Sequence, residues 1–262
     1  MESDIVKLEQ IGISYGKETV LDNITMRFPR GKLIAITGPA GCGKSTLLKI
    51  AAGLVYPDRG RVQINEKDIF SISRTELFQM RKEIAFVFQD AALLSNLTVY
   101  NNIALPLRYH FNPPEEELDR KVNEMLTMFD LKNEKNLFPA QLSFGQRKLV
   151  SFARGLIMEP KIIFLDEPVA GIDAIAREKM VNKILPLRDD PDVTAIMVSH
   201  NLDFIKSSAD YIALMYNHRL FTYGKRDEIL KSNDPILQRI LSIIIDEEAA
   251  VAEEILGILT GH

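Results

Sequence analysis

The sequence predicts an α/β domain with a mostly parallel sheet, into which a helical subdomain is inserted. A glycine-rich loop separates an apolar run at residues 33–37 from a helix that begins at Lys44. Strand and helix patterns alternate again over residues 162–215, which favours parallel strands joined by helices. Between residues 90 and 146, in contrast, helix signals dominate. These three observations together predict the class.

The segments before the glycine-rich loop and shortly after its helix show strand patterns. Val6 and Leu8 alternate with charged neighbours, and the same alternation recurs at Ile24, Met26 and Phe28. The helix from Lys44 is expected to reach about Ala52. Further strands are expected around residues 62–64 and 84–88.

The middle of the chain predicts two helices. Pro113-Pro114 precede three glutamates, which stabilise the first turn of a helix through its dipole. Apolar residues then follow at helical spacing, and they are Leu118, Val122, Met125, Leu126 and Phe129. A second helix is expected over about residues 145–158.

After this insertion, strands are expected at 162–165, 195–198 and 211–215, with helices from Ala174 and Leu202. The tail from Asp234 carries apolar residues at helical spacing followed by an acidic stretch. It predicts one or two amphipathic helices.

Composition limits the function classes. The net charge of −4 argues against a nucleic-acid partner, and the single cysteine, Cys42, suits a reducing compartment. The start of the chain resembles no secretory signal. No window approaches the roughly 20 apolar residues that span a bilayer. We therefore expect a soluble chain whose membrane role, if it has one, comes through a partner.

The glycine-rich loop fits the pattern G-x-x-x-x-G-K-[ST], which binds phosphate. Its glycines let backbone N–H groups converge on phosphate oxygens, and the following helix adds a favourable dipole. Lys44 is expected to reach the β- and γ-phosphates, and Ser45 to ligate Mg²⁺. The alternative is an ordinary glycine-rich strand–helix turn, and Cys42 is interpreted as a small loop residue. The candidate phosphate-binding residues are Gly38, Pro39, Ala40, Gly41, Cys42, Gly43, Lys44, Ser45 and Thr46.

A second candidate site follows the apolar run at residues 162–165. This run ends in Asp166 and Glu167, and a buried strand has little reason to end in two acids unless a cation lies there. Asp166 suits a Mg²⁺ ligand, and Glu167 suits a base for an attacking water. By itself, an acidic turn at the end of a strand explains the pair equally well.

The run Leu142-Ser143-Phe144-Gly145-Gln146 resembles the signature motif of ABC ATPases, usually LSGGQ. Phe144 replaces the usual glycine at the third position. Five further matches occur in family order, and they are Tyr15, Gln89, Asp166-Glu167-Pro168, Gly171-Ile172-Asp173 and His200. The resemblance extends over about residues 5–229.

This resemblance implies roles for the matched residues. Tyr15 would stack on adenine, and Gln89 would touch Mg²⁺ or the attacking water. His200 would contact the γ-phosphate, although alone it is better explained as a structural histidine at the end of a strand. Ser143, Gly145 and Gln146 would meet the γ-phosphate held by a second copy of the chain, near Asp173. Two ATP molecules with Mg²⁺ would then lie in a head-to-tail homodimer.

The resemblance also implies a fold and a domain plan. The fold is a P-loop NTPase (RecA-like) α/β core with an inserted α-helical subdomain and an N-terminal antiparallel β subdomain. We expect one ABC ATPase domain over 1–262. Residues 1–89 and 147–230 would form the nucleotide-binding core, 90–146 the helical signature subdomain, and 231–262 a C-terminal helical tail.

Three short stretches, residues 92–107, 167–173 and 232–238, are similar to the Mla/Mce phospholipid-transport ATPases. Such ATPases pair with a membrane permease that acts on lipid held by an Mce-domain protein. This implies a peripheral location at the cytoplasmic face of the inner membrane. Leu93, Leu94 and Val99 are candidate permease contacts, or equally core residues. The alternatives are an amino-acid or lipoprotein transporter, or a division-type ABC ATPase signalling to a membrane partner.

Overall fold

The computed structural model describes residues 3–260, with side chains for residues 3–247 and 250. The chain forms two compact units. The first contains residues up to Ser71 and those from Ile196 onward, and the second is Ile72–Ala195. None of the helices in the described part of the chain is long and apolar enough to cross a membrane.

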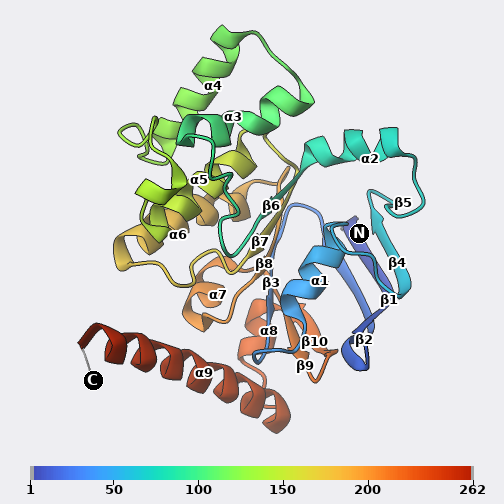
Figure 1. The fold of residues 1–262 in the computed structure, drawn as a ribbon. Helices are drawn as coiled ribbons and strands as arrows, with labels where there is room; N and C mark the ends of the chain where they lie inside the picture. The colour runs from blue at the N-terminus through green and yellow to red at the C-terminus, as the bar shows by residue number, and fades with distance from the viewer. Residues whose placement is uncertain (1–2, 261–262) are drawn as a thin grey trace. The chain divides into compact units, whose positions relative to one another are not determined.

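The first unit contains a four-stranded antiparallel sheet at the N-terminus (Figure 1). Its strands are β1 (Asp4–Tyr15), β2 (Glu18–Pro29), β4 (Arg59–Ile64) and β5 (Lys67–Asp68), in the order β2-β1-β4-β5. Val6 lies opposite Phe28 on one side and Ile64 on the other, and all three are buried. The alternation seen in the sequence therefore corresponds to one buried face of this sheet.

The first unit also contains the strand that leads into the phosphate loop. In it lie, in this order, β10 (Arg219–Lys225), β9 (Tyr211–Tyr216), β3 (Leu33–Thr37) and the last three residues of β8 (Thr194–Val198), whose first two residues belong to the second unit. β3 pairs with β9 in parallel, and every residue of β3 is buried. Burial on both faces explains why β3 has a continuous apolar sequence. The short helices are α1 (Lys44–Ala51), α7 (Leu202–Ser208) and α8 (Arg226–Leu230).

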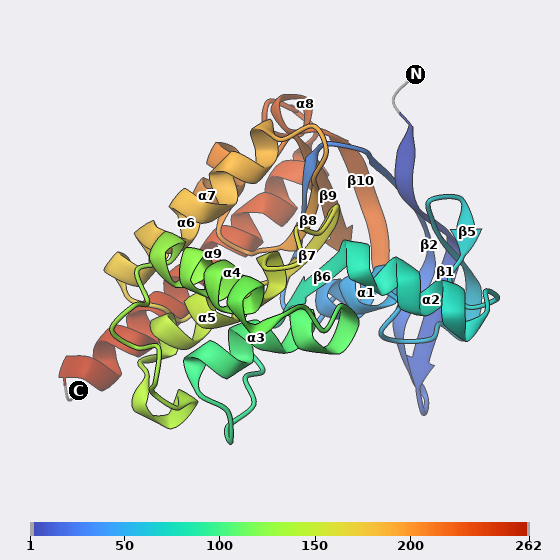
Figure 2. The same ribbon diagram turned by 90° about the horizontal axis from the view of Figure 1, so that it is seen from above.

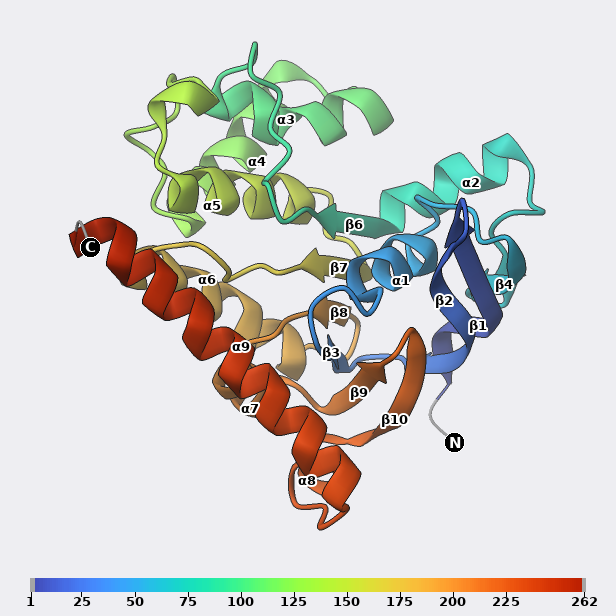
Figure 3. The same ribbon diagram turned by 60° about the horizontal axis from the view of Figure 1, so that its bottom comes forward.

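The tail forms one unbroken helix, α9 (Pro235–Thr260), as Figure 3 shows. The Asp234 carboxylate accepts hydrogen bonds from the N–H groups of Ile236 and Leu237, which caps the helix start. Four apolar residues at helical spacing are buried, and they are Leu237, Ile240, Leu241 and Ile244. Part of the apolar face predicted for the tail is therefore buried in a single copy of the chain, while Ile236 at its start exposes 58% of its surface.

The second unit combines two parallel strands with a group of helices. β6 (Ile84–Val87) pairs with β7 (Ile162–Asp166), and the N–H of Thr194, which begins β8, donates to the Lys161 carbonyl. The helices are α2 (Arg74–Met80), α3 (Val99–His110), α4 (Glu115–Met128), α5 (Phe144–Leu156) and α6 (Ala174–Asp189). α3 packs against both α4 and α5 (Figure 2).

This arrangement confirms the α/β class, the helical insertion and the N-terminal antiparallel sheet. The residue boundaries predicted for the subdomains stay a prediction. Val99 is fully buried and its N–H donates to the Leu137 carbonyl, so of the two alternatives it is a core residue. Leu94, in contrast, exposes 44% of its surface.

Candidate active site

The predicted phosphate loop lies between β3 and α1 in the first unit, and two of its glycines are required by close contacts. Gly38 has a φ of 149°, and a Cβ there would lie 2.2 Å from the Met215 carbonyl oxygen. Gly43 has a φ of 96°, and a Cβ there would lie 2.5 Å from the Val20 carbonyl oxygen. Only glycine fits either position, so the loop conformation is specified by the motif.

Lys44 and the start of α1 complete this loop. The Lys44 ammonium donates to the carbonyls of Gly38 at 2.6 Å and Pro39 at 2.8 Å, so it folds over the loop. Gly43 is the N-cap of α1 and has no side chain to cap it. A helix start of this kind favours an anion, because its first N–H groups have no partner within the helix. Ser45 and Thr46 lie in the same first turn.

Glu247 of α9 lies at the phosphate loop and was not predicted. Its carboxylate accepts a hydrogen bond from the Ala40 N–H at 3.0 Å. Cys42, two residues further on, exposes only 5% of its surface, and this burial raises the pKa of its thiol. One backbone N–H of the phosphate loop thus donates a hydrogen bond to an anionic side chain.

Two other predicted residues belong to the first unit. Tyr15 ends β1 and exposes 58% of its surface, as a stacking platform for an aromatic ring requires. His200 follows β8 and is half-buried. The neighbouring Ser199 N–H donates to the Ile36 carbonyl at 3.1 Å. His200 therefore lies beside the end of β3, from which the phosphate loop departs.

In the second unit, Asp166 and Glu167 end β7 and expose only 2% and 7% of their surfaces. The chain itself places a cationic side chain near these two acids. The Lys148 ammonium donates to the Glu167 carbonyl at 2.7 Å. Burial lowers the pKa of Lys148 to about 8, and the charges of Glu167 and Asp166 oppose that lowering. Lys148 was not predicted as a site residue. The sequence does carry a signal for it, because a lysine lies there among the apolar positions of α5.

The signature residues form the start of α5. Ser143 is the exposed N-cap, its hydroxyl accepts from the Gln146 N–H at 3.2 Å, and the Gln146 side chain accepts from the Ser143 N–H at 2.9 Å. A Cβ at Gly145 would lie 2.4 Å from the Ala176 Cβ and 3.3 Å from an Asp173 carboxylate oxygen. The structure therefore brings Gly145 together with Asp173, which caps α6.

The predicted magnesium donors differ in their surroundings. Asp166 is buried at the end of β7, Gln89 is exposed two residues after β6, and Ser45 lies in the first turn of α1. Mg²⁺ that binds with a nucleotide takes few protein ligands besides phosphate and water. Each of these three side chains carries an oxygen donor of the kind that suits such an ion.

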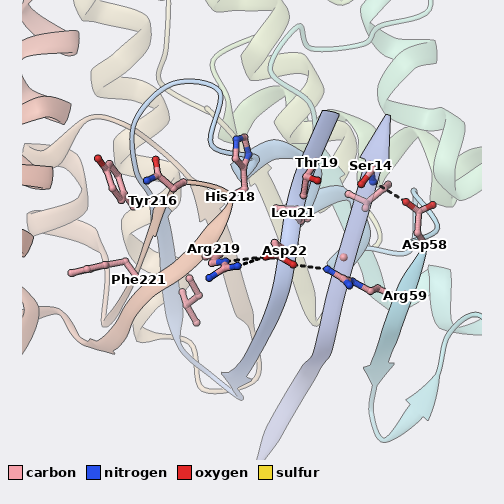
Figure 4. A pocket seen from close by; sticks show the side chains of 14 residues that line it. Ser14, Thr19, Leu21, Asp22, Asp58, Arg59, Tyr216, His218, Arg219 and Phe221 are labelled. Carbon is pink, nitrogen blue, oxygen red and sulfur yellow. Dashed lines mark hydrogen bonds and ion pairs between the residues drawn. The ribbon is translucent and has the colours of Figure 1, made fainter. Parts of the chain in front are cut away.

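A cavity of about 920 Å³ also lies in the first unit (Figure 4). Asp22 lies between Arg219 and Arg59 and pairs with both, and the hydrogen bond from Arg219 is the main cause that lowers the pKa of Asp22. None of the predicted site residues lines this cavity. The ion pairs of Asp22 with Arg59 and Arg219 thus connect β2 to β4 and to β10.

The chain is similar to known proteins over most of its length. A family model described as ABC transporter matches residues 21–170. The intermembrane phospholipid transport ATP-binding protein MlaF of Escherichia coli K12 is 32% identical over 244 residues, which covers 93% of this chain and 91% of that protein. The probable ribonucleotide transport ATP-binding protein mkl of Mycobacterium tuberculosis is 32% identical over 268 residues, which covers 98% and 75% respectively.

Solved structures give the same result. The dimeric post-hydrolysis state of the ATP-binding cassette MJ0796, bound to ADP and Pi, matches with a TM-score of 0.78 and 31% identity, covering 84% of this chain and 98% of that one. A nucleotide-free ATP-binding cassette from an ABC transporter matches with a TM-score of 0.76 and 29% identity, covering 91% and 98%. The chain has the P-loop NTPase fold and belongs to the ABC transporter family as an ATP-binding, ATP-hydrolysing subunit.

Proposed function

We propose that this ATPase homodimerises on membrane permease subunits and drives phospholipid transport between membranes. The observation that carries this proposal is the match to MlaF, which extends over 93% of this chain and 91% of that protein. Three segments of the sequence also resemble the Mla/Mce class, as described above. An Mce-domain lipid-binding protein in the same complex, and a location at the cytoplasmic face of the inner membrane, are parts of the same proposal.

We assign the phosphate loop to binding ATP. The residues concerned are Gly38, Pro39, Ala40, Gly41, Cys42, Gly43, Lys44, Ser45 and Thr46. Their amides and the Lys44 ammonium neutralise the phosphate charge, and Tyr15 stacks on the adenine. The Lys44 ammonium, which donates to the Gly38 and Pro39 carbonyls in this structure, exchanges these hydrogen bonds for a phosphate oxygen when ATP binds.

Glu167 accepts a proton from the water that attacks the γ-phosphate, or orients that water, and His200 contacts the phosphate. Ser45, Asp166 and Gln89 would hold Mg²⁺. That ion, when bound, neutralises charge on the β- and γ-phosphates. Burial of Glu167 excludes bulk water from the base, which strengthens its electrostatic action.

Ser143, Gly145, Gln146 and Asp173 are assigned to the nucleotide held by a second copy of the chain. Support comes from the start of α5, where exposed Ser143 leads a helix N-terminus that suits an anion. The dimeric solved cassettes to which this chain is similar support the pairing. Each nucleotide would then require two protomers.

The test is purification of the tagged full chain from native membranes in mild detergent, followed by mass spectrometry of proteins and lipids. We expect a permease, an Mce-domain protein and bound phospholipid. Recovery of the chain with a permease whose complex carries no lipid, or of a free monomer, would contradict the proposal.

A second candidate substrate is a ribonucleotide, which the name of the mycobacterial mkl relatives suggests at 32% identity over 98% of this chain. Those relatives are longer, since the chain covers 75% of their length. The same purification separates the two candidates, because a nucleotide transporter would copurify with no Mce-domain protein and would not enrich phospholipid.

A further inference from the structure

Lys148 is a fully buried lysine with a specific set of partners. It lies on α5, one turn after Phe144, and exposes 1% of its surface. An ammonium group is rarely buried unless it is well paired. Here it donates to two backbone carbonyls, those of Glu167 and Ala170, each at 2.7 Å. Both partners belong to the segment that follows β7.

The backbone at Glu167, whose carbonyl accepts the hydrogen bond from Lys148, is conformationally strained. Glu167 has a φ of 47°, which lies in the left-handed region that residues other than glycine seldom adopt. Such a conformation persists only where its surroundings hold it. The Glu167 carbonyl accepts from both the Lys148 ammonium and the Ala170 N–H, the latter at 3.3 Å. These two bonds fix the peptide plane that follows Glu167, and thereby the direction of its side chain.

Phe144, the departure from the usual signature, encloses the same ammonium. The Lys148 Nζ lies 5.2 Å from the centroid of the Phe144 ring, within the range of a cation–π contact. The ring also approaches Gly171, where a Cβ would lie 3.3 Å from a ring carbon. The signature helix thus contacts the segment after β7 through Phe144 and Lys148 together.

We propose that Lys148 is a positioning residue for ATP hydrolysis, which holds Glu167 in the conformation that its carboxylate needs to act on water. This inference rests on the proposed role of Glu167. In this inference, α5 is the element that supports the end of β7, where Asp166 and Glu167 lie. Phe144 also has a role, because its ring covers the Lys148 ammonium.

The test is a double-mutant cycle on the full chain with Lys148→Met and Glu167→Gln, measured as steady-state hydrolysis and ATP binding. K148M should lower kcat roughly 30-fold, part of the effect of a general base, and leave KM within about twofold. The double variant should hydrolyse no more slowly than E167Q, because Lys148 acts only through Glu167. If K148M does not fold, Lys148→Gln replaces it in the same cycle; its amide is uncharged and too short to reach both carbonyls, so kcat should still fall, by less than in K148M.

Arg147→Met is the matched control. Arg147 neighbours Lys148 on α5 and lies 5.5 Å from the same Phe144 ring, but it donates to the Leu142 carbonyl. It should keep kcat within about twofold, since its hydrogen bond goes to Leu142 and not to the segment after β7. An unchanged kcat in K148M, losses that multiply in the double variant, or an equal loss in R147M would each overturn the inference. E167Q hydrolysing at the wild-type rate would instead overturn the role of Glu167 itself.

Discussion

The Glu247 carboxylate on α9 accepts a hydrogen bond from the backbone N–H of Ala40 in the phosphate loop, at 3.0 Å. These residues are separated by 207 positions in the sequence, and both belong to the first unit. A bound phosphate would use the same kind of donor. The tail helix therefore places a carboxylate at the loop that would bind the negatively charged phosphates of ATP.

The first prediction concerns this contact. Glu247→Gln should tighten ATP binding about fivefold, because it removes a charge that repels phosphate and weakens a competing hydrogen bond. The measurement is the ATP dissociation constant by calorimetry. Asp246→Asn is the control, since Asp246 is the exposed acid next to it on α9. Equal affinity in E247Q and the wild type would show that the contact does not compete with ATP.

The second prediction concerns Lys44. Lys44→Ala should weaken ATP binding by roughly 10- to 100-fold through loss of a charge-assisted phosphate contact. Lys49, in the last turn of the same helix, provides the control variant Lys49→Ala. Calorimetry with ATP measures both. Affinity of K44A close to that of K49A would contradict the role assigned to the loop lysine.

The third prediction concerns Gly145. Gly145→Ala should lower the free energy of unfolding by about 2 kcal/mol, because the new methyl group would overlap Ala176. Gly155→Ala, on the same helix, is the control. A Cβ at residue 155 would lie 3.3 Å from a Val87 methyl carbon, which is a milder contact. The higher helix propensity of alanine offsets the cost of that contact. Urea unfolding measures both variants, and Ala176→Gly should restore part of the loss in G145A.

The fourth prediction concerns Cys42, the one cysteine of the sequence. Its pKa is raised by burial, so less thiolate is present at pH 8 than in an exposed cysteine. Iodoacetamide should therefore modify the native protein at least about tenfold more slowly than a cysteine peptide. The rate should rise with pH as thiolate forms. A rate equal to that of the peptide at pH 8 would show that the phosphate loop opens freely.

The fold was largely predictable where a local pattern sufficed. β3 and β7 are short apolar runs because both faces are buried, and α4 begins after Pro113-Pro114 at Glu115 as expected. α2 was missed, although Ser73 and Glu76 form a capping box at its start. Seven residues with no buried side chain give little periodicity for a pattern to detect.

The candidate site was predictable in its motifs and not in its supporting contacts. The phosphate loop and the acids after β7 are short runs of adjacent residues, so the sequence alone marks them as candidates. Lys148 reaches Glu167 only because α5 packs beside the end of β7. Glu247 reaches Ala40 only because α9 lies along the first unit. Contacts of this kind depend on tertiary packing, for which no short pattern exists.

The central claim is that this chain hydrolyses ATP with Glu167 as the residue that activates water. The most direct measurement is steady-state hydrolysis by Glu167→Gln, together with its ATP affinity. We predict that affinity stays within about threefold of the wild type while kcat falls by at least about 100-fold, the usual scale for a lost general base. Hydrolysis by E167Q at the wild-type rate would contradict the account.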